Sequence, residues 1–362
     1  MAEGQISVWC LLGRKAGDNT QVLALSEELG WGYREMSILA RPWELFTHLS
    51  LRVTLAGIDR DKSSRLTPPW PDLVISAGRR NEPVARWIQR QSGGQTRLVH
   101  IGRPWAPLAA WDLVVTTPQY FLPRQSNTRH NNLPLHRMAD KDLAAAGAEL
   151  RERYSELPRP WIAVFLGGDS GKFVFTAQKG ARLGRLCEQL VSREGGSLLL
   201  TDSPRTPRDA GDALAAELSV PHSYHRWGDS GPNPYQGLLD QADAFIVTGE
   251  SMSMLAEAAA RSRPLLIFDI GDGDTPWWRL PHAWRYKPLS HRFAIRFGPG
   301  RMRRDVGRIQ DALVADGGAV WLSQGQLDNA LTAPAEGSSL SNLAERELRE
   351  TAEAVRRLVK PR

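Results

Sequence analysis

The chain has 362 residues, of which 41% are hydrophobic and 24% are charged, and its formal net charge is +6. These proportions are typical of folded globular proteins and exclude a disordered chain, and no apolar run approaches the roughly 18 residues that span a bilayer. The length predicts two domains of roughly 150 to 200 residues each. The two cysteines are too few for a disulfide framework and no secretion signal is evident, so a cytoplasmic protein is expected. The positive charge favours anionic partners.

In the first half of the chain, short apolar runs alternate with helical patterns. The runs are predicted as buried strands: ISVWCLL at 6–12, PDLVISAG at 71–78, TRLVHIG at 96–102 and WDLVVTT at 111–117. Between them, residues 19–30 and 80–93 have helical spacing and end at glycine. A loop is predicted at 118–137 and a helix follows it. The prolines within 157–160 are predicted to mark the linker between the domains.

A second series of strands and helices follows this linker. Strands are predicted at 161–168, 196–203, 243–249 and 264–271. Strands that alternate with helices predict a mostly parallel sheet with right-handed crossovers, and here the pattern occurs twice. We therefore expect an α/β protein with two Rossmann-like domains, residues 1–157 and 158–335. An amphipathic C-terminal helix within 336–362 is expected to pack back across the linker.

Candidate site residues lie in the loops that follow the strands, because open parallel sheets bind ligands beyond the carboxyl ends of their strands. In the loop GRKAGDNTQ, Asp18 is a candidate general base, and Lys15 and Asn19 are candidate contacts to an acceptor or anion. A strand-to-helix turn with an Asx cap explains the same loop equally well. Arg79 is either a forked anion donor or a solvated arginine, and His100 is either a base or, more commonly, a structural histidine.

The segment FLGGDSGKF, residues 165–173, follows the first strand of the second half. Gly167 and Gly168 would let a ligand approach the backbone, and Lys172 follows within reach. The segment lacks the first glycine and the Ser or Thr of a P-loop, which argues against ATP hydrolysis. Beyond the next strand, TDSPRTP contributes three polar residues: Ser203, Arg205 and Thr206. These two strand ends and the one at Thr248 to Ser253 are expected to converge on one crevice.

The third of these strand ends opens into a helix with the sequence SMSMLAEA. Ser251 and Ser253 can cap this helix, yet neither completes a Ser-x-x-Glu capping box. Glu257 lies one turn after Ser253 on the same face, so that hydroxyl and carboxylate can address one ligand. A phosphate at the helix N-terminus and ribose hydroxyls on Glu257 would together suit a nucleotide diphosphate.

Two further features have competing interpretations. The triplet DGD at 272–274 could hold a divalent metal, but the glycines around it favour a turn, and no metal is expected. Residues 285–308 hold eight basic residues against one acid, Asp305. Such a segment is usually a solvated face, and contact with an anionic membrane surface is the alternative.

Six segments relate the chain to a known family: GRKAGDNTQVLALSEELG, SAGRR, VHIGRP, LLLTDSPRTP, NPYQGLLDQADAFIVTGESMSMLAEA and HRFAIRF. In these segments, which are spread in order over residues 13–297, the chain resembles the mitochondrial fission family of elongated-mitochondria proteins from plants and their bacterial relatives. The resemblance implies a fold like that of GT-B glycosyltransferases, with the nucleotide sugar held mainly by the C-terminal domain. The chain has Glu250 where an aspartate is common in the family, so the expected donor site rests on Ser251, Ser253 and Glu257.

Three functions follow from these features. The preferred one is a metal-independent GT-B glycosyltransferase that transfers a sugar from a nucleotide diphosphate to a cell-envelope acceptor at the cytoplasmic membrane face. Lys172, Arg205 and the helix N-terminus would stabilise the departing diphosphate, and Asp18 or His100 would activate the acceptor hydroxyl. The alternatives are a non-catalytic adaptor, as the plant members suggest, and a nucleotide-sugar epimerase of GT-B fold. No cofactor and no nucleic-acid partner are expected.

Overall fold

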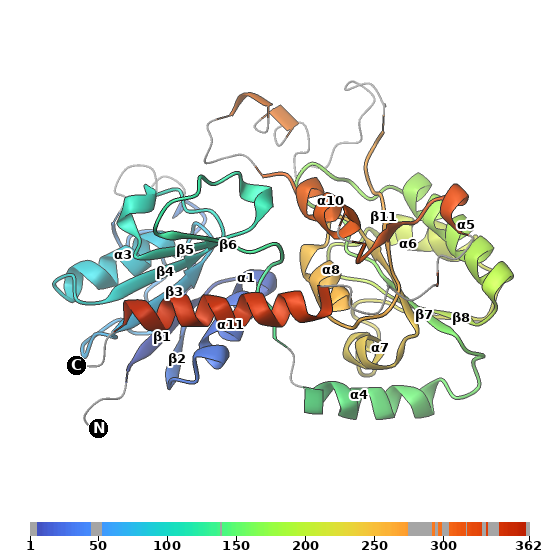
Figure 1. The fold of residues 1–362 in the computed structure, drawn as a ribbon, viewed down its shortest axis with the longest axis horizontal. Helices are drawn as coiled ribbons and strands as arrows, with labels where there is room; N and C mark the ends of the chain where they lie inside the picture. The colour runs from blue at the N-terminus through green and yellow to red at the C-terminus, as the bar shows by residue number, and fades with distance from the viewer. Residues whose placement is uncertain are drawn as a thin grey trace. The chain divides into compact units, whose positions relative to one another are not determined.

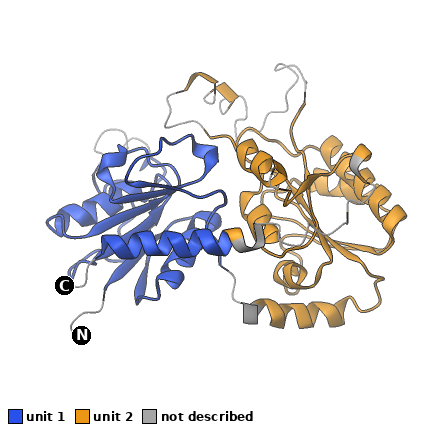
Figure 2. Cartoon of the chain, viewed as in Figure 1, with its two compact units in different colours: residues 1–137, 344–362 blue, residues 138–343 orange. Residues whose placement is uncertain are grey.

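The computed structural model describes residues 6–44, 53–137, 140–273, 292–293, 296–298, 304–315, 317–327, 331 and 340–359. The chain forms two compact units, shown in Figures 1 and 2: Met1–Arg137 with Ala344–Arg362, and Met138–Leu343. Each unit is built around a six-stranded parallel sheet with helices packed against it. This confirms the prediction of two Rossmann-like parallel sheets. Within the described residues, no helix is both long and apolar enough to cross a membrane.

Unit 1 has the strand order β2-β1-β3-β4-β5-β6, and every neighbouring pair is parallel. The strands are β1 (Val8–Leu12), β2 (Tyr33–Ser37), β3 (Leu73–Ala77), β4 (Arg97–Ile101), β5 (Leu113–Thr116) and β6 (Thr128–His130). The described helices are α1 (Ala16–Leu29), α3 (Glu82–Gln91), the short η1 (Leu108–Ala110) and η2 (Pro118–Tyr120), and α11 (Leu340–Leu358), which enters unit 1 at Ala344.

Both faces of this sheet are buried, which explains why its inner strands are continuous apolar runs rather than alternating ones. Along β1, Val8 and Cys10 contribute to a core cluster with α1 and α11. Their neighbours Trp9 and Leu11 contribute to a second cluster, which includes α3. The period of two along a strand therefore divides unit 1 into two core layers.

The last helix, α11, completes the core of unit 1. Leu348, Ala352 and Val355 are buried in the same cluster as α1 and β1. Polar contacts fix its position: Thr351 Oγ1 accepts hydrogen bonds from Arg129 Nε at 2.9 Å and Asn131 Nδ2 at 3.0 Å. The C-terminal helix, which was expected to pack back across the linker, thus packs onto the core of unit 1.

Unit 2 has the strand order β12-β11-β10-β7-β8-β9, again entirely parallel. Its strands are β7 (Trp161–Phe165), β8 (Ser197–Thr201), β9 (His222–His225), β10 (Ala244–Thr248), β11 (Leu265–Phe268) and β12 (Val320–Trp321). The described helices are α4 (Asp140–Arg153), α5 (Ala177–Glu194), α6 (Arg208–Ala215), α7 (Tyr235–Gln241), α8 (Met252–Ala259), α10 (Gly307–Ala315) and the short η5 (Gln324–Gln326).

The boundary between the units lies at residue 137, twenty residues before the predicted limit of the first domain at 157. The helix α4 therefore belongs to unit 2. A Cβ atom on Gly237 of α7 would come within 2.6 Å of the Ala146 carbonyl oxygen of α4, and a Cβ on Gly147 would come within 1.9 Å of Asp240 Oδ2. Glycine on each helix thus permits the close crossing that joins α4 to unit 2.

Candidate functional site

The loops that follow β7, β8 and β10 meet at the carboxyl end of the sheet in unit 2. Gly168 has a φ of +118°, and a Cβ there would lie 2.3 Å from the Arg205 carbonyl oxygen in the loop after β8. A Cβ on Gly167 would lie 2.0 Å from Glu250 Oε1 in the loop after β10. The three strand ends that were expected to share one crevice are therefore in contact, and this contact requires glycine at both positions.

Two of the predicted ligand contacts instead support the glycine loop. Ser203 Oγ donates to the Gly167 carbonyl oxygen. Thr206 Oγ1 donates to the carbonyl oxygens of Gly167 at 3.0 Å and Leu166 at 3.1 Å. A hydroxyl has a single hydrogen, so in this arrangement neither group has a donor left for a ligand. Both residues brace the glycine loop in this structure, and their contact with a nucleotide-sugar donor stays a prediction.

The two predicted cations differ in what surrounds them. Lys172 Nζ forms an ion pair with Asp305 Oδ1 at 2.9 Å, which already neutralises its charge. The Arg205 guanidinium donates through Nη1 to the Asp169 carbonyl oxygen at 3.2 Å, and the Asp169 amide donates back to the Arg205 carbonyl oxygen at 3.2 Å. Arg205 is thereby fixed beside the glycine loop, where its charge can act on an anion.

Glu250 connects the loops after β7 and β10. Its Oε1 accepts hydrogen bonds from the Gly168 amide at 2.6 Å and from Thr248 Oγ1 at 3.2 Å. The same threonine oxygen accepts from the Gly167 amide at 2.8 Å. The side chain is buried, and burial raises the pKa of Glu250 to about 7 although the charge of Arg205 opposes this. Its second oxygen, Oε2, is buried with no hydrogen-bond partner in the described part of the chain.

The helix α8 begins beside this carboxyl group. Ser251 occupies the N-cap position, and its side chain makes no capping hydrogen bond within the described structure. Ser253 lies in the first turn and is partly exposed. The hydroxyls near this helix start are thus not used for capping, and unpaired amides at a helix N-terminus favour an anion.

Glu257, one turn further along α8, interacts with a residue that the sequence did not indicate. The Tyr235 hydroxyl, at the start of α7, donates to Glu257 Oε2. The Tyr235 ring packs on Phe165 with 4.7 Å between ring centroids. Burial raises the pKa of Glu257, and the Tyr235 hydrogen bond and the charge of Arg261 oppose that rise. The phenol therefore stabilises the ionised carboxylate. The only available signal was the position of Tyr235 in NPYQG, a segment of the family resemblance.

In unit 1, the loop after β1 is held by its own amide side chain. Asn19 Oδ1 accepts from the Gly13 amide at 2.8 Å, and Asn19 Nδ2 donates to the Gly13 carbonyl oxygen at 2.8 Å. The turn interpretation thus explains Asn19 better than a ligand contact does. Lys15 is exposed at the N-cap of α1. Asp18 is partly exposed in its first turn, and a Cβ on Gly78 would lie 2.6 Å from its Oδ2.

The prediction that His100 is a general base is corrected. The ring is fully buried in β4, its Nδ1 lies 3.1 Å from Ser76 Oγ, and its centroid lies 4.5 Å from that of Trp111. Burial lowers the pKa of His100 to about 3, because the imidazolium would lose its hydration there. A neutral ring without exposed surface cannot reach an acceptor, so His100 is structural.

Two other predicted charges form ion pairs. Arg79 Nη2 lies 2.9 Å from Glu44 Oε1, and its guanidinium stacks over the Trp105 ring at 5.0 Å. Asp272, the first aspartate of DGD, pairs with Lys179 at 2.6 Å and with Arg292. The second aspartate of the triplet, residue 274, lies outside the described residues, as does much of the basic segment 285–308.

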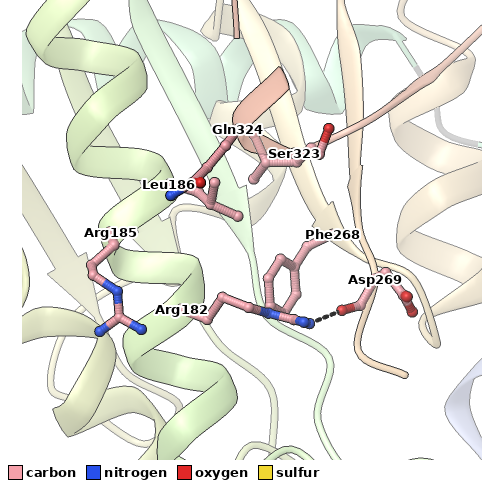
Figure 3. A pocket seen from close by; sticks show the side chains of 8 residues that line it. Arg182, Arg185, Leu186, Phe268, Asp269, Ser323 and Gln324 are labelled. Atoms are coloured by element: carbon pink, nitrogen blue, oxygen red, sulfur yellow. Dashed lines mark hydrogen bonds between the residues drawn. The ribbon is translucent and has the colours of Figure 1, made fainter. Parts of the chain in front are cut away.

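A separate hollow of about 410 Å³ lies beside α5, near the ends of β11 and β12 (Figure 3). Arg182 on α5 stacks over the Phe268 ring at 4.7 Å and donates to the Asp269 carbonyl oxygen. The remaining lining residues are Arg185, Leu186, Leu322, Ser323 and Gln324. None of the predicted site residues lines this hollow.

Comparison with known proteins places the chain in a family. The profile of the family described as Mitochondrial fission ELM1 matches residues 16–296, well over half of the chain. The protein belongs to this family. The Mitochondrial fission protein ELM1 of Arabidopsis thaliana is 26% identical over 248 residues, which is 62% of this chain and 57% of the plant protein. The chain thus matches little more than half the length of this ELM1 relative.

An uncharacterised protein of Rickettsia prowazekii (strain Madrid E) is 23% identical to this ELM1-family chain over 297 residues, which is 73% of this chain and 83% of the rickettsial one. Among solved structures, UDP-GlcNAc 2-epimerase from Methanocaldococcus jannaschii superposes with a TM-score of 0.55. The alignment covers 96% of this chain and all of the epimerase at 9% sequence identity. The likeness concerns the fold, and the predicted GT-B-like architecture is confirmed.

Proposed function

We propose that this ELM1-family protein is a GT-B-type glycosyltransferase that uses a nucleotide-diphosphate sugar without a metal ion. The observation that supports this is the meeting of the Gly167–Gly168 loop, the uncapped start of α8 and Glu257 at one end of the sheet in unit 2. The unpaired amides of a helix N-terminus suit phosphate, and a carboxylate one turn on suits a ribose diol.

In this proposal the chain's own groups stabilise the leaving diphosphate. Arg205 and the α8 N-terminus supply positive charge at fixed positions, so little reorganisation is needed when charge develops. Asp272 is held by two cations, Lys179 and Arg292, which supports a mechanism that does not use DGD as a metal site. In unit 1, Asp18 remains the candidate base for a cell-envelope acceptor, because His100 is buried.

A thermal-shift screen of the full chain against UDP-, GDP-, ADP- and CMP-linked ligands tests the proposal. We expect one ligand to raise Tm, and Glu257→Gln to reduce that rise because an amide lacks the charge that strengthens hydrogen bonds from ribose hydroxyls. Glu194→Gln, at an exposed position at the end of α5, is the matched control and should keep the full rise. If none of the ligands shifts Tm, the glycosyltransferase proposal fails and an adaptor is favoured.

We further propose that the basic segment 285–308 contacts an anionic bilayer. Phe293 and Phe297 are 66% and 67% exposed, and their ring centroids lie 5.1 Å apart. The Arg296 guanidinium lies 5.8 Å from the Phe297 ring. Exposed aromatic rings with adjacent arginines suit the interface of an acidic membrane.

Co-sedimentation with vesicles tests this contact. Binding to phosphatidylserine-containing vesicles should exceed binding to pure phosphatidylcholine vesicles, and Phe293→Ser with Phe297→Ser should abolish the difference. Trp227→Ser is the control, because Trp227 is also exposed at 55% but lies outside the basic segment. Equal binding to both vesicle types, or full binding by the double variant, would refute the contact.

A further inference from the structure

The carboxyl group of Glu250 has two oxygens in unlike surroundings. Oε1 accepts two hydrogen bonds, from the Gly168 amide and the Thr248 hydroxyl. Oε2 is equally inaccessible to water, and no donor in the described part of the chain reaches it. A buried anionic oxygen without a donor is costly, whereas a protonated oxygen there becomes a donor itself. The proton of a neutral Glu250 therefore belongs on Oε2, and both hydrogen bonds to Oε1 persist in either state.

The charges around this carboxyl group are few. Arg205, from the loop after β8, is the cation whose field favours the ionised form. Asp169, from the loop after β7, is tied to Arg205 through reciprocal backbone and guanidinium bonds. On the side of α10, Gln310 contributes a neutral amide, which donates to the Gly249 carbonyl oxygen. Arg205 is thus the main charge that favours ionised Glu250, and the hydrogen bonds from the Gly168 amide and Thr248 act in the same direction.

We propose that Glu250 takes up a proton when a diphosphate binds at these strand ends, so that ligand binding and protonation are coupled. The inference rests on the proposed nucleotide-diphosphate site. A bound diphosphate adds negative charge beside a buried carboxylate and competes for the field of Arg205. Because both effects disfavour the ionised form, a carboxyl group that titrates near pH 7 in the free protein becomes protonated in the complex.

The coupling has a definite sign. Above pH 7 the free protein carries an ionised Glu250, so binding must draw a proton from solution. The affinity for a diphosphate then falls as pH rises, by up to about tenfold per pH unit for one coupled proton. Well below pH 7 the carboxyl group of the free protein is already protonated, so this dependence disappears.

Isothermal titration calorimetry of the full chain tests the proposal, with UDP, GDP, ADP and inorganic pyrophosphate as probes. Each titration is run at pH 8 in two buffers of different ionisation enthalpy, which reports the protons taken up. Glu250→Gln is the matched variant, since its amide keeps an oxygen acceptor and carries permanent donors in place of the proton. We expect wild type to take up about one proton more than Glu250→Gln for the same probe. Any titration of the probe itself is common to both proteins.

A second variant guards against misfolding of the first. Thr248→Val removes a hydrogen bond that favours the ionised carboxylate, so it should shift the pH midpoint of the coupling upward while proton uptake persists. Binding with equal proton uptake by wild type and Glu250→Gln would overturn the coupling and leave the nucleotide site standing. If none of the four probes binds, the proposed function fails and this inference fails with it.

Discussion

Glu82, at the start of α3, is a buried acid with a structural task. Its carboxylate accepts the Trp105 amide at 2.8 Å and the Ala106 amide at 2.9 Å, which fixes the loop after β4. Burial raises the pKa of Glu82 to about 7 from an ordinary 4.5, despite these hydrogen bonds. The group therefore binds a proton more tightly in the folded protein than in the unfolded chain.

This difference makes the stability of unit 1 depend on pH. Between pH 4.5 and 7 the unfolded chain releases the proton of Glu82 and the folded protein keeps it, so the free energy of unfolding falls as pH rises. Across that window the loss amounts to about 3 kcal/mol. Glu82→Gln should remove this contribution. Hydrogen–deuterium exchange of β3 and β4 between pH 5 and 8 measures it, and parallel curves for wild type and variant would contradict the expectation.

Tyr235 provides a second test at a single side chain. Tyr235→Phe leaves Glu257 Oε2 without its donor, which should lower the free energy of unfolding of unit 2 by about 1–3 kcal/mol and raise the pKa of Glu257 further. Denaturant-induced unfolding, monitored by hydrogen–deuterium exchange of the β10 amides, measures the change in the free energy of unfolding. Tyr154→Phe is the control, since the Tyr154 oxygen accepts one long bond, 3.4 Å from Ser223 Oγ. Equal losses of free energy of unfolding in both variants would show that the Tyr235–Glu257 hydrogen bond stabilises unit 2 no more than the long Tyr154 bond does.

Residue types at strand ends could be predicted from the sequence, but their partners could not. Asp18 follows a strand and His100 lies near the end of one, so both fit the pattern of a base at a strand end. Only the packing of Trp111 against His100 reveals that the imidazole has no access to solvent. Ser203 and Thr206 were located correctly, but which oxygen their hydroxyls meet depends on the path of the glycine loop. Glu250 was left out of the expected donor site because its side chain is longer than the aspartate that is common there in the family. That length lets its carboxylate reach the Gly168 amide.

At the scale of elements, the inner strands of the two sheets could be predicted from the sequence, but the outer strands β2 and β9 could not. The strands β1, β3 and β4 are apolar runs buried on both faces, and their limits fall within the predicted ranges. The outer strands β2 and β9, YREMS and HSYH, are polar and partly exposed, so neither shows a clear period. Their extended conformation comes from pairing with β1 and β8, which no local pattern records.

The contribution of the α4–α7 crossing to stability can be tested directly. Gly237→Ala would drive a methyl group to 2.6 Å from the Ala146 carbonyl oxygen and 2.9 Å from Leu150 Cβ, so the helices must move apart. We expect a loss of about 1–3 kcal/mol in unit 2, despite the better helix propensity of alanine. Gly325→Ala is the control, because its new Cβ meets open space. Denaturant midpoints measure both, and a neutral Gly237→Ala would show that the helices tolerate separation.

At the scale of the whole molecule, the core of unit 1 is assembled from both ends of the chain. Glu347 on α11 accepts the Asn132 amide at 2.7 Å and the Leu133 amide at 3.2 Å. Together with the buried leucine, alanine and valine positions of α11, these bonds make the last helix a structural part of unit 1.

Val355→Asp tests that dependence. A carboxylate placed in the cluster of α11, α1 and β1 loses its hydration, which should destabilise unit 1 by several kcal/mol. Limited proteolysis followed by mass spectrometry should then show rapid cleavage in unit 1 and surviving fragments of unit 2. Glu353→Gln, exposed on the same helix, should resist cleavage as wild type does. Loss of both units together would indicate that they unfold as one.

The position of α11 also has a consequence for synthesis on the ribosome. Residues 344–359 are translated after every residue of unit 2, although they belong to the unit that is begun first. Unit 2 can therefore fold its sheet before α11 is available to cover one core face of the sheet in unit 1. The order of folding in the cell is expected to run opposite to the order of translation.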